Sequence, residues 1–217
     1  MAGTLYIGTR RYSSWSFRGW LPVRLAALDV RVEVIPLAGG VTPAIKALIL
    51  SGTVPFLDHD GNQVWDSLAI MEYCAEIAPA LWPADRKART RARSMAAEMH
   101  SGFRALRTAM PMSLFRFAAG AGRTEASLAD VARVTRLWTD ALEKSGGPFL
   151  FGAAFGNADA AFAPVVARFQ TYQPEIDATA RAYCDAVRAH SLVAQWYETA
   201  ASEPAEWFIP AMESDAV

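Results

Sequence analysis

The stretch that decides the fold is Thr53-Val54-Pro55-Phe56-Leu57-Asp58-His59-Asp60-Gly61-Asn62-Gln63-Val64-Trp65-Asp66-Ser67. Its middle part predicts a β-hairpin with Asp60-Gly61 at the turn, because this pair suits the backbone angles of tight hairpins. Pro55 stands directly before an apolar strand, although proline cannot donate to a sheet ladder. Asp66-Ser67 predicts a helix start that presents amides, a hydroxyl and a carboxylate at one point. These features together predict a site that holds a small peptide-like ligand by its backbone and its charged end.

The residues before this stretch predict a strand, a helix and a second strand. The strands are expected at 5–7 and 31–37, and the helix at 16–28, where apolar residues recur at helical spacing. This order indicates a βαβ unit with a parallel strand pair. A short helical piece at 43–50 and a helix at 67–77 complete a compact α/β layer.

The composition changes at Ala78-Pro79-Ala80-Leu81-Trp82-Pro83, a linker bounded by prolines. Beyond it the sequence predicts helices almost exclusively. One long helix is expected from Arg86 to about Ala118, bent at Gly102 and Pro111. Further helices are expected at 124–144, 158–172, 175–190 and 192–201. The fold class is therefore an α/β domain followed by an all-α domain.

The bulk properties exclude several classes of protein. The chain has 217 residues, 53% of them hydrophobic, and a net charge of -1, which argues against disorder and against nucleic-acid or anionic-membrane partners. Cys74 and Cys184 lie in apolar helical patterns and are expected to be buried free thiols, as in a reducing cytoplasm. We predict no signal peptide, no membrane span and no metal site.

A serine-rich turn follows the first predicted strand, at Tyr12-Ser13-Ser14-Trp15-Ser16-Phe17-Arg18. Its hydroxyls can point at a helix N-terminus, where free amides and the helix dipole favour an anion. Ordinary capping by one serine is the alternative. The spacing Ser13-x-x-Ser16 occupies the place where thioredoxin folds carry Cys-x-x-Cys, so dithiol chemistry is excluded there.

With these motifs in order, the chain resembles a bacterial member of the cytosolic glutathione S-transferase superfamily, closest to its serine-type, zeta-like classes. The likeness rests on the serine turn, Val54-Pro55, Asp66-Ser67-Leu68-Ala69-Ile70 and Phe155-Gly156-Asn157-Ala158-Asp159-Ala160. It implies a thioredoxin-like glutathione-binding domain at 1–79, a linker at 80–87 and an all-helical domain at 88–217 that forms the electrophile site. It also implies a cytoplasmic homodimer that acts in detoxification.

The resemblance assigns ligand contacts in the first domain. The proline that matches Pro55 is cis in the family, which would turn the backbone of Val54 towards the cysteinyl unit of glutathione. Asp66 would bind the ammonium of the γ-glutamyl end, and Ser67 with its amide would bind the carboxylate. Simple N-capping is the alternative for Asp66-Ser67, and both roles can hold together. No residue is assigned to the glycyl carboxylate.

The catalytic demand is small enough for one serine. Lowering a thiol pKa from ~8.5 by ~1.5–2 takes roughly 2–2.7 kcal/mol, and one hydrogen bond to a charged acceptor supplies about 1.5–3 kcal/mol. By position Ser13 matches the family's catalytic serine, and Ser14 is the second candidate. Ser16 is expected at the helix start.

A second group of candidates would surround the co-substrate. Trp15 stands where zeta-type sequences usually have cysteine, and Met99-His100-Ser101-Gly102-Phe103-Arg104 falls where the long helix borders the site in relatives. Trp15, His100, Ser101 and Arg104 are therefore supporting or co-substrate candidates. Met110, Met112, Phe115 and Phe117 would line an apolar pocket or pack in the core, and Asp159 is expected to be structural.

The predicted function is conjugation of the glutathione thiolate to an apolar electrophile, with glutathione as co-substrate and no metal. Two alternatives stay open. One is glutathione-dependent cis–trans isomerisation of a maleylacetoacetate-like substrate. The other is a non-catalytic glutathione-binding or regulatory module.

Overall fold

A four-stranded mixed sheet forms the first part of the computed structural model, which describes residues 2–37, 42–49 and 51–213. The strands are β1 (Gly3–Gly8), β2 (Val30–Ile35), β3 (Phe56–His59) and β4 (Asn62–Val64), in the order β2-β1-β3-β4. β1 pairs in parallel with β2, and the other pairs are antiparallel, with Leu5 opposite both Val32 and Leu57. Both the βαβ unit and the hairpin are confirmed.

The hairpin turn forms where the Asp-Gly pair predicts it. Asp60 and Gly61 have φ angles of 50° and 78°, which a tight turn between right-twisted strands requires. The turn sets the register of β3, so that Leu57 points into the core with no exposed surface. The same register brings Pro55, just before β3, to the end of the sheet that faces the helices.

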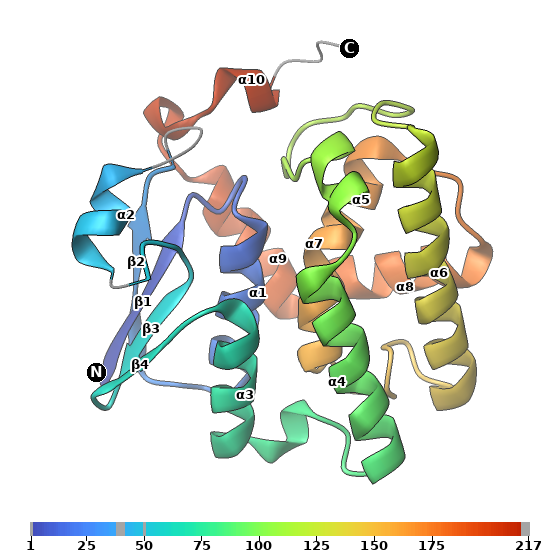
Figure 1. Ribbon diagram of the computed structural model, residues 1–217, viewed down its shortest axis with the longest axis horizontal. Helices are drawn as coiled ribbons and strands as arrows, with labels where there is room; N and C mark the ends of the chain where they lie inside the picture. Colours follow the sequence, from blue (N-terminus) through green and yellow to red (C-terminus); the bar gives the residue numbers. More distant parts are fainter. Residues whose placement is uncertain (1, 38–41, 50, 214–217) are drawn as a thin grey trace.

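Helices cover the two faces of the sheet (Figure 1). α1 (Ser14–Leu25) and α3 (Ser67–Ile77) pack on one face and continue into the main core. α2 (Pro43–Leu48) covers the other face, where Ile45 and Ile49 pack on Ile35 and Phe56. The predicted piece at 43–50 is thus helical to Leu48, and Leu50 lies outside the described residues.

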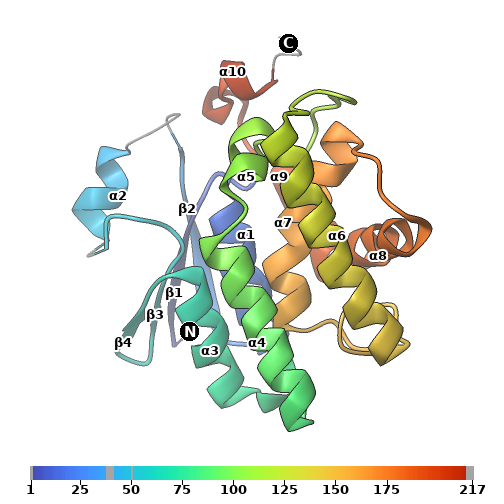
Figure 2. The ribbon, with the colours of Figure 1, turned by 45° about the vertical axis from the view of Figure 1, so that its right-hand side comes forward.

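The second part of the chain is helical (Figure 2). It comprises η1 (Pro79–Leu81), α4 (Arg86–Ser101), α5 (Arg104–Ala109), α6 (Glu125–Ser145), α7 (Asn157–Tyr172), α8 (Ala178–Ala189), α9 (Ser191–Ala201), η2 (Ala205–Trp207) and α10 (Pro210–Glu213). α7 lies at the centre and is buried along nearly its whole length. It also contacts α1, so the helical part packs directly on the first domain. A thioredoxin-like domain followed by a helical domain is confirmed.

The helix predicted from Arg86 to about Ala118 is wrong as one continuous element, but the bends expected at Gly102 and Pro111 fall where the chain does leave helical structure. α4 ends at Ser101, and Phe103 takes a left-handed conformation with φ 57° before α5 begins. Gly102 permits the break, because a Cβ there would lie 2.7 Å from the carbonyl oxygen of Glu98. After α5 the chain leaves helical structure at Met110 and Pro111, and it becomes helical again at Glu125.

The remaining helix predictions are confirmed, with ends shifted by a few residues as is usual for helix termini. Cys74 and Cys184 are buried free thiols, as expected. Across the described ranges, the helices are too short or too polar for a membrane crossing.

Candidate functional site

A cavity of about 370 Å³ opens where the first domain meets α4. Its lining residues are Trp15, Thr53, Val54, Pro55, Asp66, His100 and Ser101. They come from the first turn of α1, the loop before β3, the cap of α3 and the end of α4. A larger hollow of about 660 Å³ lies beside Glu72 and Arg93, but the predicted site residues do not line it. The smaller cavity is therefore the candidate site.

The Val54–Pro55 peptide bond is cis, as the resemblance implies. Pro55 is buried beneath α1, where Gly19 faces it. A Cβ on Gly19 would lie 2.6 Å from Cγ and 2.8 Å from Cβ of Pro55. The missing side chain at Gly19 thus allows the loop that carries Val54 to approach the helix closely.

Gly19→Ala is expected to lower the free energy of unfolding by about 1–3 kcal/mol, because the added methyl overpacks the contact with Pro55. Helix propensity acts in the opposite direction, since alanine is better than glycine inside a helix by roughly 0.5–1 kcal/mol. The sign of the change in urea denaturation therefore decides. A more stable variant would show that the contact tolerates a methyl group.

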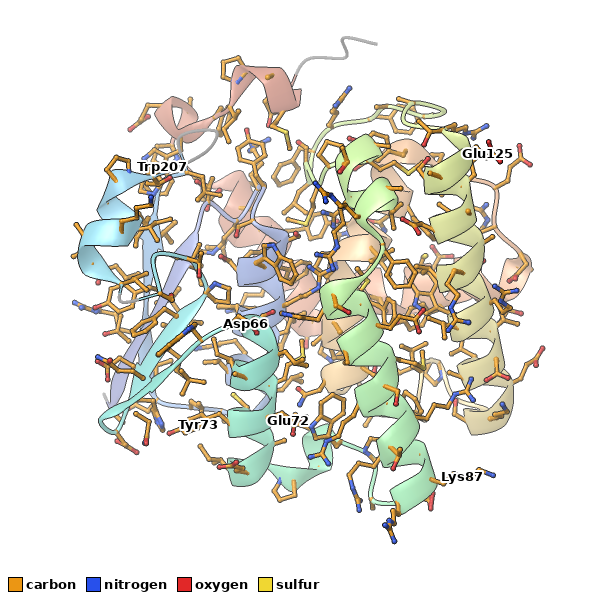
Figure 3. The ribbon with its side chains drawn as sticks, in the orientation of Figure 1. Asp66, Glu72, Tyr73, Lys87, Glu125 and Trp207 are labelled. Carbon is orange, nitrogen blue, oxygen red and sulfur yellow. The ribbon has the colours of Figure 1, made fainter. Side chains whose placement is uncertain are left out.

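The start of α3 offers the carboxylate of Asp66 (Figure 3) and the hydroxyl of Ser67. Asp66 caps the helix through Oδ1, which accepts from the amide of Leu68 at 2.9 Å. Its Oδ2 lies 3.2 Å from Nε2 of His100 on α4. Ser67 is 1% exposed, and within the described part of the chain its Oγ has no hydrogen-bond partner. A buried hydroxyl without a partner is unfavourable, so a ligand oxygen bound at this helix start would satisfy it, although Ser67 itself does not belong to the described lining of the cavity.

Trp15 forms one wall of the cavity. Its ring meets His100 edge-on, with ring centroids 5.2 Å apart. The guanidinium carbons of Arg18 and Arg107 lie 5.1 Å and 4.6 Å from the centre of the same ring. Trp15 therefore lies between the cavity and the two positively charged guanidinium groups.

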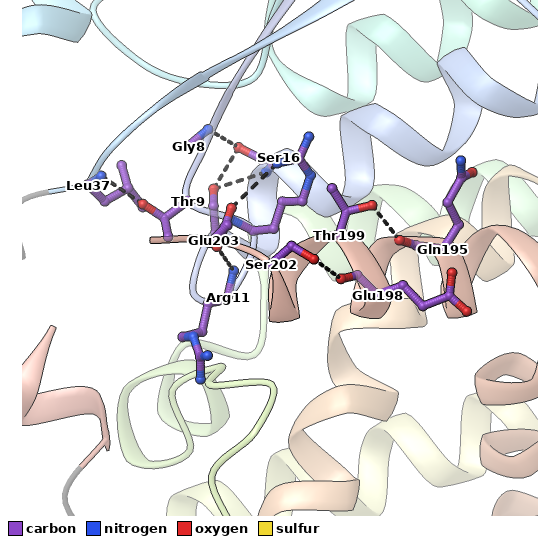
Figure 4. Close-up of polar contacts among 12 residues, drawn as sticks. Gly8, Thr9, Arg11, Ser16, Leu37, Gln195, Glu198, Thr199, Ser202 and Glu203 are labelled. Atoms are coloured by element: carbon purple, nitrogen blue, oxygen red, sulfur yellow. Dashed lines mark hydrogen bonds and ion pairs between the residues drawn. The ribbon is translucent and has the colours of Figure 1, made fainter. Parts of the chain in front are cut away.

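The two serines make different contacts at the start of α1. Ser13 is the N-cap and is 7% exposed; its Oγ accepts from the amide of Ser16 at 3.2 Å and lies 2.7 Å from Ser16 Oγ. Ser16 Oγ in turn accepts from the amide of Gly8 at 2.9 Å (Figure 4). Ser14 is half-buried and its Oγ accepts from Arg168 at 3.4 Å. Neither serine belongs to the described lining of the cavity, although both directly precede Trp15.

The other residues predicted to surround the co-substrate lie at different distances from the cavity. Ser101 is exposed at the rim of the cavity, whereas the described cavity lining does not include Arg104, which is exposed at the start of α5. Met110 and Met112 are buried in the core, while Phe115 and Phe117 are 44% and 69% exposed. The predicted apolar pocket is therefore not formed by these four residues as a group.

Two glutamates near the C-terminus, Glu203 and Glu213, hold the turn at 10–12, and we call this contact the C-terminal clasp. Glu203 accepts from the amides of Arg10 at 2.7 Å and Arg11 at 3.2 Å (Figure 4), and burial raises the pKa of its carboxyl group. The Tyr12 hydroxyl donates to Glu213 at 2.5 Å. The clasp thus holds the turn that precedes Ser13. Local sequence patterns give no signal for it, because its partners lie about 190 residues apart.

Comparison with protein families identifies the family of the chain. The family model for the glutathione S-transferase N-terminal domain matches residues 12–77, and the model for the C-terminal domain matches residues 84–199. The chain belongs to the glutathione S-transferase family. The N-terminal match includes every cavity-lining residue of the first domain, from Trp15 to Asp66.

Individual known proteins are similar to this chain in sequence or in fold. Protein IN2-1 of Zea mays is 27% identical over 174 residues, which cover 78% of this chain and 67% of that protein. The structure resembles a glutathione transferase homologue from Burkholderia gl BGR1 with bound glutathione, with a TM-score of 0.72 and 22% sequence identity. The match covers 94% of this chain and 100% of that chain. It also resembles a theta class glutathione S-transferase from Xanthomonas axonopodis pv. citri with glutathione bound, with a TM-score of 0.64 and 22% sequence identity. This match covers 94% of this chain and 98% of that chain.

Proposed function

We propose that this protein is a glutathione transferase that binds glutathione in the cavity between the Val54-Pro55 loop and α3. The observation that carries the proposal is the buried hydroxyl of Ser67 at a helix N-terminus, which has no partner among the described residues, with the carboxylate of Asp66 beside it. These two groups match the carboxylate and the ammonium of a γ-glutamyl unit. Glutathione bound to similar folds in two solved structures supports the same choice of ligand.

His100 joins this part of the site from the helical domain. Its Nε2 lies 3.2 Å from Oδ2 of Asp66 and can donate a hydrogen bond to it. The carboxylate of Asp66 would attract the ligand's ammonium group. Val54 would pair with the cysteinyl unit through its backbone, which places the thiol near the start of α1.

The thiolate would be stabilised there by a serine hydroxyl together with the positive end of α1. Ser13 is the proposed donor, and Ser14, whose oxygen already accepts from Arg168, is the second candidate. The thiolate would then attack an electrophile held against the helical domain. We place the protein in the serine-type, zeta-like group, as a cytoplasmic homodimer in detoxification, with domains at 1–79 and 88–217 joined by residues 80–87.

The proposal is tested by glutathione binding, measured by titration calorimetry on the wild type and on Ser67→Ala. The variant is expected to raise Kd by about 10- to 100-fold, which corresponds to one hydrogen bond to a charged group. Ser94→Ala is the matched control, because Ser94 is exposed on α4 and its hydroxyl donates only to its own helix, at Thr90. An unchanged Kd in Ser67→Ala would contradict this assignment, and no binding to the wild type at millimolar glutathione would overturn the proposed function.

A further inference from the structure

Three arginines meet behind Trp15, where α1, α5 and α7 come together. We call Arg18, Arg107 and Arg168 the arginine cluster. Arg18 and Arg168 are 2% and 4% exposed, and Arg107 is half-buried. Arginine is seldom buried without a partner of opposite charge, because removing its charge from water is costly.

Backbone carbonyls hold the arginine cluster in place. Arg18 donates from Nε to Ala161 at 2.7 Å, and Arg168 donates from Nε to Met110 at 2.8 Å. Arg107 donates to the last carbonyls of α4, at Met99 and His100. These neutral acceptors fix the orientation of the guanidinium groups, but they do not balance their charge.

The positive charge is left largely uncompensated. Over the described ranges no carboxylate forms an ion pair with Arg18 or Arg168, and only Asp130 acts on Arg107. Burial, followed by repulsion from Arg168 and Arg107, holds the pKa of Arg18 well below its usual range. Nη2 of Arg18 and Nε of Arg107 have no acceptor among the described residues. The cluster therefore combines unused donors with surplus positive charge.

The arginine cluster reaches the candidate site through Trp15 and Ser14. Arg107 lies against the ring of Trp15, which lines the cavity, and donates to the carbonyl of His100, another lining residue. Arg168 donates to Ser14, at the helix start proposed to face the thiol. None of the three arginines belongs to the described lining of the cavity, so a group attached to the sulfur of bound glutathione would have to pass Trp15 to reach the half-buried Arg107.

We propose that the arginine cluster binds the carboxylate, or a similar oxyanion, of an anionic co-substrate. The inference rests on the proposed function and changes one part of it, because the electrophile then carries a negative charge instead of being wholly apolar. Guanidinium groups suit this role, since their planar donors match the two oxygens of a carboxylate. Docking of the carboxylate would align the electrophilic carbon of the co-substrate with the thiolate.

The test compares two ligands on the full-length wild-type protein by titration calorimetry: S-hexylglutathione and its ω-carboxy analogue of the same chain length. The carboxy analogue is expected to bind about tenfold more tightly or better, as one charge-assisted hydrogen bond provides. Equal or weaker binding of the carboxy analogue would overturn the inference while S-hexylglutathione binding leaves the proposed function intact. If neither ligand binds, the result overturns both the inference and the proposed function.

Arg107→Met assigns the effect to the arginine cluster, because Arg107 is its most accessible member. The preference for the carboxy analogue is expected to disappear in this variant while the Kd of S-hexylglutathione stays within about twofold. Arg136→Met, on the exposed face of α6, is the matched control for loss of one positive charge and should keep the preference. A preference that survives in Arg107→Met overturns the assignment. If Arg107→Met does not fold by circular dichroism, the wild-type comparison decides alone.

Discussion

Replacing Asp159 by alanine is expected to lower the free energy of unfolding by about 3–5 kcal/mol. Asp159 is 1% exposed and anchors the start of α7, the helix on which both domains pack. One carboxylate oxygen accepts from the amide of Leu150 at 3.0 Å and the hydroxyl of Tyr183 at 3.1 Å, and the other accepts from the amide of Gly156 at 2.9 Å. Alanine would leave these three donors unpaired, two of them in fully buried contacts. Urea denaturation followed by circular dichroism measures the loss, and a loss below about 1 kcal/mol would contradict this role.

Asp159→Asn separates the charge of this side chain from its hydrogen bonds. Burial raises the pKa of Asp159 to about 6 in the folded protein from 3.8, so the folded state binds a proton more tightly than the unfolded state. The free energy of unfolding should therefore fall as the pH rises from about 4 to about 6, and this contribution should be absent in Asp159→Asn. Identical pH profiles for the two proteins would show that Asp159 does not titrate in this window.

Ser13→Ala is expected to raise the pKa of the thiol of bound glutathione by about 1.5–2 and to slow conjugation at neutral pH by about 10- to 100-fold. The physical reason is the loss of one hydrogen bond to the thiolate at the N-terminus of α1. The ultraviolet absorbance of the thiolate, followed against pH with glutathione bound, measures the pKa directly. Conjugation of an aryl halide at saturating glutathione measures the rate.

Ser14→Ala is the matched variant for this experiment. If the thiol pKa is unchanged in Ser13→Ala but raised in Ser14→Ala, the activating hydroxyl is that of Ser14. Ser13 also caps α1, so its loss costs about 1 kcal/mol of stability, and both variants require a folding control. A thiol pKa that is unaffected in both variants would exclude a serine mechanism.

Local sequence was sufficient for the first domain and for much of the candidate site. The hairpin at Asp60-Gly61 and the cap at Asp66 depend on backbone angles and hydrogen bonds within a few residues. Such features can be recognised from residue type alone. The cavity lining includes Trp15, Val54, Pro55, Asp66, His100 and Ser101, which short motifs and the family resemblance predict as site residues. Four other predicted site residues lie outside the described lining: Ser13, Ser14, Ser67 and Arg104.

Features that depend on distant contacts could not be predicted. The sequence pattern predicts a bend at Gly102, but it does not predict the left-handed conformation of Phe103 that separates two helices. Arg18 and Arg168 come together only because α1 packs on α7. A basic residue inside a helical pattern looks like a solvated one until its surroundings are known. The charged groups behind Trp15 were therefore missed.

The C-terminal clasp also has a consequence for biosynthesis. Glu203 and Glu213 emerge from the ribosome long after the turn at Arg10, Arg11 and Tyr12 that they hold. Because domains generally fold as units from the N-terminus during synthesis, the sheet can form first while this turn still lacks its final contacts. The nascent first domain would therefore have an incomplete serine turn, and this part of the site would be completed only after translation has passed Glu213.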